Sequence, residues 1–221
     1  MDSAQSRSLR KMVTRCREIL EKSVFELLEG KYGIHRGGTV EDAGRLIYLT
    51  DEDRRGREEI VASLGHLKSF GLDARAAVER LVREVAFTHL NRLCALKMIE
   101  QRGLIREAVG RGHDSRGFKY YLAEHPEEEA AWLAGEQDLV YRRFLQSSAG
   151  ALEEEIGSLF SRNDPARTLF PPPRALKEVL EQINDPDLNE VWRQDETIGW
   201  VYQLELPRFG GHRQALVFRL Q

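Results

Sequence analysis

Residues 6–29 read SRSLRKMVTRCREILEKSVFELLE, and this stretch indicates a helical fold. Its apolar side chains recur at steps of three and four residues, which places them on one face of an α-helix. They are Leu9, Met12, Val13, Cys16, Ile19, Leu20, Val24, Leu27 and Leu28. The same pattern follows two helix-start signals, running from Thr50 towards Gly71 and from Asp73 to Gly103. The first half of the chain is therefore predicted to form three amphipathic helices.

The second half continues the helical pattern with interruptions. Residues 110–117 (GRGHDSRG) form a polar glycine-rich loop, and residues 118–122 fit a short strand or a helical turn. Pro126 and three glutamates predict one helix that ends near residues 147–150. Further helices are expected at 151–160, at 174–183 and, as an aromatic-rich short pair, at 191–203. We predict an all-α fold, an irregular helical domain of about six to eight helices with a divergent C-terminal tail.

Composition supports a globular protein. The chain has 221 residues, 41% hydrophobic and 31% charged, enough to bury roughly 70% of its unfolded surface. No apolar run approaches the roughly 20 residues of a membrane span, and the polar, basic N-terminus does not resemble a signal peptide. Two cysteines cannot build a disulfide framework. We expect a cytoplasmic protein that does not bind membranes.

The polar face of the first predicted helix is basic. It carries Arg7, Arg10, Lys11, Arg15 and Arg17, a layout that can neutralise several phosphates. A merely soluble surface is the alternative interpretation, because Glu18, Glu21, Glu26 and Glu29 follow on the same helix. These cations are our candidates for contact with the DNA backbone, and they predict weak, non-specific binding of double-stranded DNA that falls steeply with salt.

No residues stand out as a catalytic, cofactor or metal site. The six histidines are scattered without the spacing of metal ligands, and His89 is expected to be a hydrogen-bonded side chain within its helix. The loop at 110–117 lacks the flanking strand and the lysine of a nucleotide-binding loop. A nuclease-like Glu-x-Lys triplet occurs once, from Glu29 to Lys31, at a predicted helix end. We expect no catalytic residue, no metal and no cofactor in this chain.

Two segments resemble a known family. Residues 86–100 (AFTHLNRLCALKMIE) resemble the A-(Y/F)-T-x-F-N-R-L-x-A-L-R-x-M-E segment near the N-terminus of the large adenine-specific DNA methyltransferases of bacterial phage-exclusion (BREX) systems, the PglX type. Residues 196–203 (ETIGWVYQ) resemble the segment that precedes the methyltransferase domain of that family. The order and separation of the segments also agree. The resemblance covers roughly residues 10–203, so we expect residues 1–203 to be a PglX-like helical N-terminal region and 204–221 a divergent tail.

The resemblance implies a much longer enzyme in which S-adenosylmethionine donates a methyl group to an adenine flipped out of the duplex. That chemistry needs a glycine-bearing cofactor loop and an Asn-Pro-Pro-Tyr type loop, and this sequence has neither. We therefore expect a catalytically silent N-terminal fragment, with a tail that reflects a truncated or frame-shifted reading frame. Its expected partners are double-stranded DNA, a catalytic domain and other phage-exclusion components.

A different class of function stays open. A stand-alone helical interaction module would dock a partner through aromatic side chains near the end of the chain. The candidates are Trp192, Trp200 and Tyr202. Ordinary core packing explains the same residues equally well. A nuclease subunit is the third alternative, and it would depend on Glu29.

Overall fold

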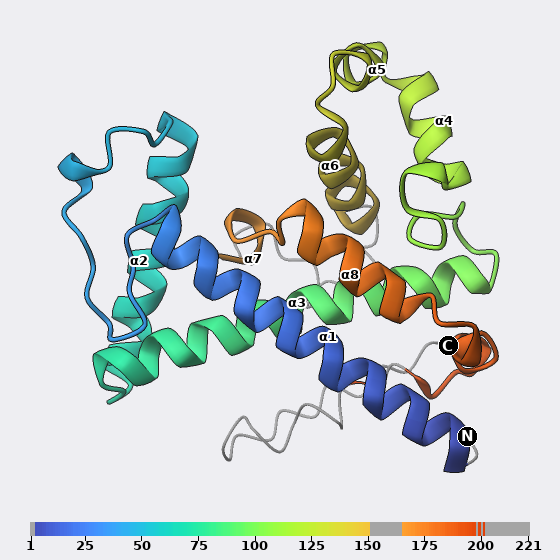
Figure 1. The fold of residues 1–221 in the computed structure, drawn as a ribbon, viewed down its shortest axis with the longest axis horizontal. Coiled ribbons are helices and arrows are strands. Elements are labelled where there is room, and N and C mark those ends of the chain that lie inside the picture. The colour runs from blue at the N-terminus through green and yellow to red at the C-terminus, as the bar shows by residue number, and fades with distance from the viewer. Residues whose placement is uncertain (1–2, 151–164, 198, 200, 202–221) are drawn as a thin grey trace. The chain divides into compact units, whose positions relative to one another are not determined.

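The structure, a computed structural model, describes residues 3–150, 165–197, 199 and 201, and it confirms the all-α prediction for them (Figure 1). The α-helices are α1 (Ser3–Gly30), α2 (Asp51–Ser69), α3 (Ala74–Gln101), α4 (Arg116–Glu124), α5 (Pro126–Leu133), α6 (Gln137–Gly150), α7 (Pro165–Thr168) and α8 (Pro173–Ile183). Short 3-10 helices are η1 (Ala43–Arg45), η2 (Gly112–Asp114), η3 (Pro186–Leu188) and η4 (Val191–Arg193). Within these residues the extended backbone pairs at one isolated bridge, between Ile34 and Val40.

The start of α2 confirms the predicted cap. The Thr50 hydroxyl accepts a hydrogen bond from the backbone N–H of Asp53 at 3.1 Å. The Asp53 carboxylate accepts one from the Thr50 N–H at 3.2 Å, so the two residues form a reciprocal capping box. Two backbone donors that the helix cannot satisfy internally are thereby paired.

The prediction of one helix from Pro126 to residues 147–150 is wrong, because two helices occupy this stretch. Gly135 adopts φ +96°, a left-handed conformation that ends α5. Its N–H donates to Trp132 O at 3.1 Å, and the N–H of Glu136 donates to Ala131 O at 3.0 Å. This pair of bonds is a Schellman motif, and the chain then reverses into α6.

Other expectations for the second half fare differently. Residues 118–122, which fitted a strand or a turn, lie inside α4. The helix expected at 174–183 is α8, which begins one residue earlier at Pro173. The expected helix at 151–160 and the tail at 204–221 lie outside the described residues. Of the helix pair expected at 191–203, residues 198, 200, 202 and 203 also lie outside them. The predicted boundary after residue 203 therefore stays a prediction.

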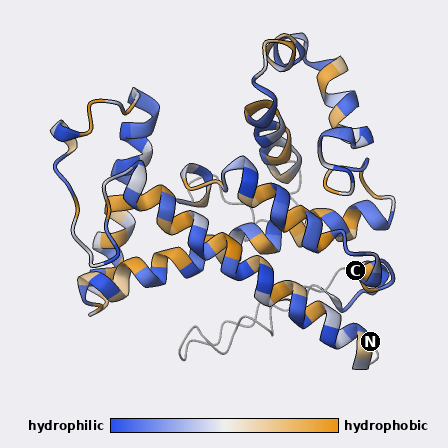
Figure 2. Ribbon diagram, viewed as in Figure 1, coloured by the Kyte–Doolittle hydropathy of each residue, from blue (hydrophilic) through white to orange (hydrophobic). Residues whose placement is uncertain are grey.

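The chain divides into two compact units. Unit 1 comprises residues 1–16, 90–160 and 177–221, and unit 2 comprises residues 17–89 and 161–176. The helices α1, α3 and α8 contribute residues to both units. Figure 2 shows the apolar stripes that run along α1 and α3, with hydrophilic residues on their other sides.

Unit 2 has a continuous apolar core. It is built from the second half of α1, the loop after it, α2, the first half of α3, and α7; its members include Val24, Leu28, Ile34, Ile60, Leu64, Leu81, Val85 and Leu169. The buried Arg57 holds the loop over this core by donating to Tyr32 O at 2.8 Å and to Glu41 O. Gly56 allows α7 to approach α2, because a Cβ there would lie 2.6 Å from the Thr168 methyl carbon.

Unit 1 holds an aromatic cluster between α4, α5 and α6. The fully buried Phe118 of α4 packs against Trp132 of α5 with ring centroids 5.1 Å apart. It also packs against Tyr141 and Phe144 of α6, at 5.2 and 5.3 Å. Edge-on and tilted contacts of this kind add to the free energy that burial supplies. They fix the hairpin of α5 and α6 against α4.

The first half of α1 packs into unit 1 through its apolar stripe. Leu9, Met12, Val13 and Cys16 are each at most 3% exposed. The Cys16 thiol lies 3.9 Å from the Val179 carbonyl oxygen of α8. Burial raises the pKa of this thiol to about 12, against the smaller opposing effect of Arg15. Cys16 is therefore a neutral, buried packing residue.

Candidate functional site

The first half of α1 presents an exposed basic face. The exposed side chains of this half of the helix include Arg7, Arg10, Lys11 and Arg15. They lie on the side opposite the buried apolar stripe. Residues 3–17 contain five basic side chains and no acidic one. The first turn of α1, as the structure describes it from Ser3 onward, also lacks an acidic residue. We call residues 3–15 of α1 the basic segment.

The structure separates Arg17 from the other four candidates. Its side chain is only 11% exposed, and its Nε lies 3.7 Å from the Glu21 carboxylate. From Glu18 to the end of α1 the helix carries four glutamates and one lysine, and this Lys22 lies 3.8 Å from Glu26. The second half of α1 is therefore an ordinary mixed surface, as the alternative interpretation expected, whereas the basic segment is not.

The aromatic candidates have a different environment. Trp192 is completely buried in unit 1, and its indole N–H donates to the Ile183 carbonyl at 2.9 Å. Its ring is therefore part of the core and is not presented to a partner. Trp200 and Tyr202 lie outside the described residues, so their role in docking stays a prediction.

Sequence reasoning did not predict a second charged cluster, in the core of unit 1. The side chains of Lys97 and Glu100 on α3 are each 5% exposed and pair at 3.2 Å. The second carboxylate oxygen of Glu100 accepts three backbone N–H bonds from residues 108–110, at 2.7, 2.8 and 3.1 Å. A buried carboxylate is tolerated only when it is paired in this way. The sequence signal was a lysine and a glutamate three residues apart in residues 93–100 (LCALKMIE), a stretch that is otherwise apolar.

Neighbouring side chains complete the attachment of this loop. The Tyr141 hydroxyl donates to Ala108 O at 2.9 Å, and the Asn184 amide donates to Val109 O at 2.9 Å. Burial raises the pKa of Tyr141, and the carboxylates of Glu100 and Glu107 add to the rise. Tyr141 is therefore a neutral hydrogen-bond donor, which suits a structural role.

This cluster explains the glycine-rich loop at 110–117. A Cβ on Gly110 would lie 2.5 Å from a Glu100 carboxylate oxygen, and one on Gly117 would lie 2.5 Å from Glu107 O. Both glycines are needed for close packing. The backbone N–H groups that could hold a phosphate at the start of this loop are already bonded to Glu100. The start of the loop therefore packs as an internal carboxylate-binding turn.

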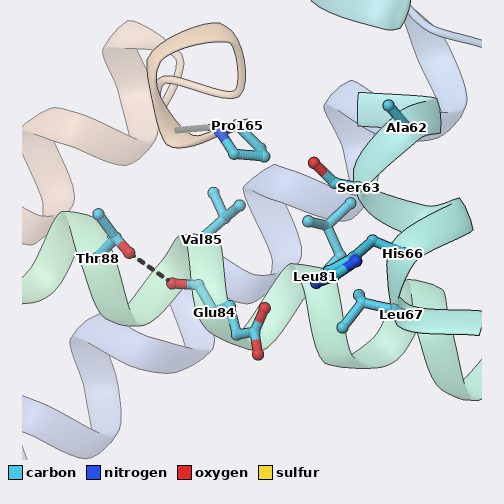
Figure 3. A pocket seen from close by; sticks show the side chains of 9 residues that line it. All are labelled: Ala62, Ser63, His66, Leu67, Leu81, Glu84, Val85, Thr88 and Pro165. Carbon is cyan, nitrogen blue, oxygen red and sulfur yellow. Dashed lines mark hydrogen bonds between the residues drawn. The ribbon is translucent and has the colours of Figure 1, made fainter. Parts of the chain in front are cut away.

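A shallow cleft of about 400 Å³ opens in unit 2 between α2, α3 and Pro165 (Figure 3). Its lining residues are Ala62, Ser63, His66, Leu67, Leu81, Glu84, Val85, Thr88 and Pro165. Glu84 is paired with Arg80 at 2.5 Å, and the Thr88 hydroxyl donates to Glu84 O at 2.9 Å. The Ser63 hydroxyl likewise donates to a carbonyl one turn earlier. The cleft therefore offers apolar contact area rather than an acid–base pair.

The remaining candidates have internal partners. His89 is 3% exposed and bonds Leu169 O at 3.0 Å, as expected for a structural histidine. Glu29 accepts the Arg36 N–H at 2.9 Å, and Lys31 pairs with Asp53 at 2.6 Å, so the Glu-x-Lys triplet is engaged in loop contacts. In the part of the chain that the structure describes, no three His, Cys, Asp or Glu side chains gather as a metal site would need. No described helix is long and apolar enough to cross a membrane.

Comparison with known proteins shows that the chain contains a region related to the BREX adenine-specific methyltransferases. The chain is 30% identical, over 142 residues and 57% of its length, to the adenine-specific methyltransferase BrxX of Escherichia coli O9:H4 (strain HS). It is 26% identical, over 182 residues and 70% of its length, to the adenine-specific methyltransferase PglX of Lacticaseibacillus casei (strain Zhang). The matched regions cover only 12% and 15% of these two relatives. No protein-family model and no solved structure matches the chain.

Proposed function

We propose that this chain is the N-terminal helical region of a site-specific adenine DNA methyltransferase of a phage-defence (BREX) system. In this role it braces a catalytic domain and contacts the DNA backbone, while the catalytic domain binds S-adenosylmethionine and the target adenine. The relation to BrxX and PglX over 57–70% of the chain supports the proposal. The small share of those relatives that is matched is consistent with a supporting region rather than the enzyme as a whole.

The basic segment carries the proposed DNA contact. Arg7 and Arg15 are eight residues apart, which spans about 12 Å of helix at 1.5 Å per residue. Double-stranded DNA carries one negative charge per about 1.7 Å of its axis. Four exposed cations over this length, with no acid among them, are therefore opposite several phosphates when α1 lies along the backbone. Such contacts position a protein on DNA without reading its sequence.

Salt-dependent binding of a short duplex tests this contact. We expect fluorescence anisotropy with a labelled 20-base-pair duplex to detect weak binding at about 25 mM salt. The logarithm of the affinity should fall with the logarithm of salt concentration with a slope between about −2 and −4, because each released counterion contributes about 0.9. A change of base sequence should leave the affinity unaltered. Absence of binding at low salt would remove the DNA contact and leave the scaffold role.

A matched pair of variants locates the interface. Arg10→Gln with Lys11→Gln removes two charges from the basic segment and should reduce the salt slope by about 2. Lys22→Gln with Lys68→Gln removes two exposed charges elsewhere, from the mixed half of α1 and from α2. This control has the same net charge and should keep most of the slope. Equal losses in both variants would show that net charge, and not the basic segment, drives binding.

The scaffold role needs its own test. The 221-residue chain and a separately expressed catalytic domain of a BREX methyltransferase should form a complex in a pull-down and in size-exclusion chromatography. The complex should form in the absence of DNA, because a brace acts through protein contacts. No association at micromolar concentrations would contradict the scaffold role and leave the DNA contact to be judged separately.

A further inference from the structure

An apolar surface with an acidic surround lies on the hairpin of α5 and α6, which we call the acidic hairpin (residues 124–139). Leu133 on α5 is 79% exposed, and Leu139 on α6 is 41% exposed. Glu129 lies four residues before Leu133, so the two side chains share the outer face of α5. Both leucines are large apolar side chains that the described fold leaves at the surface of the hairpin.

The charge of the acidic hairpin specifies the partner. Residues 120–141 contain six acidic side chains and no lysine or arginine. Among the described residues, Arg143 pairs with Glu128 at 3.1 Å, and the His113 ring lies 3.7 Å from the Asp138 carboxylate. Among the described residues no basic side chain pairs with Glu127, Glu129 or Glu136. The surface is therefore suited to a cationic partner with long aliphatic stems that can cover the leucines.

The basic segment of α1 has the complementary properties. It exposes Arg7, Arg10, Lys11 and Arg15 without an acid among them, and arginine and lysine stems pack well on apolar surface. Both surfaces belong to unit 1, but Figure 1 draws the start of α1 and helix α5 at different ends of that unit. As drawn, the two surfaces of one molecule do not meet.

We infer that the acidic hairpin docks the basic segment of a second copy of this chain. The contact is head-to-tail, because it joins two different surfaces. Each pair of molecules therefore keeps one free basic segment and one free hairpin. Association should be weak, should grow with protein concentration, and should be suppressed by salt, because exposed charges are screened beyond about 10 Å at 0.1 M ionic strength. This inference uses the same helix face as the proposed DNA contact but does not depend on it.

A pair of complementary charge variants tests the contact without DNA. Variant X carries Arg10→Glu and Lys11→Glu, and variant Y carries Glu129→Lys and Glu136→Lys, all at exposed positions. Analytical ultracentrifugation at about 25 mM salt should show the wild-type chain associating, and X and Y each associating much more weakly. An equimolar mixture of X and Y should associate again, because the unaltered acidic hairpin of X meets the unaltered basic segment of Y. Circular dichroism should show unchanged helicity in both variants.

The leucine contribution has its own matched pair. Leu133→Ser should weaken wild-type association several-fold, whereas Ile47→Ser, at an 84% exposed leucine-sized side chain of unit 2, should leave it unchanged. A wild-type chain that stays monomeric at low salt and high concentration would overturn the inference. So would self-association of X or Y at the wild-type level, or an X and Y mixture that stays monomeric. None of these outcomes bears on duplex binding, so the two proposals fail separately.

Discussion

The Glu100 cluster and the basic segment of α1 both belong to unit 1, and they use charge in opposite ways. Glu100 is buried and meets a lysine and three backbone N–H groups. The basic segment is exposed and contains no acidic side chain. A charge that the fold satisfies internally stabilises the fold, whereas a set of like charges left at the surface is available to a partner. We therefore expect the first region to contribute to stability, and we propose that the second serves recognition.

The largest expected effect tests the buried side of this comparison. Glu100→Ala leaves Lys97 and three N–H groups without their partner, and breaking a buried pair in this way costs about 3–5 kcal/mol. Urea unfolding followed by circular dichroism measures the loss. Glu58→Ala, at an exposed position of α2, should change stability by less than about 0.5 kcal/mol. A loss below about 1 kcal/mol for Glu100→Ala would contradict the structural role of the cluster.

Gly110→Ala tests the fit of the loop around that carboxylate. The added Cβ would lie 2.5 Å from Glu100 and 2.8 Å from Glu107, so the carboxylates must move. Forced rearrangement of packed groups costs typically about 1–3 kcal/mol. Gly37→Ala is the control, because nothing lies within 4 Å of its added Cβ. Similar unfolding midpoints for the two variants would show that the loop around Gly110 can accommodate a methyl group, which would contradict the close packing seen in the structure.

Glu107 gives the cluster a pH dependence. A hydrogen-bonded ion pair with Arg111 holds the pKa of Glu107 below its ordinary value of 4.5. The unfolded chain therefore binds a proton more readily, so this contribution is present above about pH 4.5 and is lost as the pH falls. Urea unfolding at pH 6 and pH 3.5 should show a smaller decrease for Glu107→Gln than for the wild-type chain. An equal decrease in both would rule out this contribution.

The smallest expected effect belongs to the exposed region. Arg10→Gln with Lys11→Gln should change the free energy of unfolding by less than about 0.5 kcal/mol, because neither side chain supports the core. The same variant should lose affinity for duplex DNA. A substantial loss of stability would show that these cations serve the fold, and it would remove the contrast between the two regions.

Much of the fold follows from local sequence signals. The periodicity of α1 and the N-cap at Thr50 are properties of a few neighbouring residues, so the sequence predicts them. The break at Gly135 was missed because the apolar pattern continues on both sides of it, and only the left-handed φ of that residue separates α5 from α6. Residues 118–122 were ambiguous because their helix is short and is stabilised by aromatic packing onto α5 and α6.

The candidate site divides in the same way. The basic segment can be recognised in the sequence because its basic side chains lie on consecutive turns of one helix. The role of Glu100 was not predicted, because its partners are backbone groups eight to ten residues later, after a turn, and no side-chain pattern marks them. Burial of Trp192 was equally invisible, since an aromatic cluster fits a core and an interface alike. The partners of Glu100 and the burial of Trp192 depend on contacts between residues far apart in the sequence, which local sequence patterns do not reveal.

Lysine reactivity in the presence of duplex DNA tests the central claim most directly, because it needs no substitution. Lys11 lies in the basic segment, and Lys22 lies about three turns later on the same helix, where it pairs with Glu26. Acetylation followed by mass spectrometry at low salt should show DNA protecting Lys11 several-fold while Lys22 and Lys68 stay reactive. Equal reactivity of Lys11 with and without DNA, under conditions where the duplex is bound, would contradict the account.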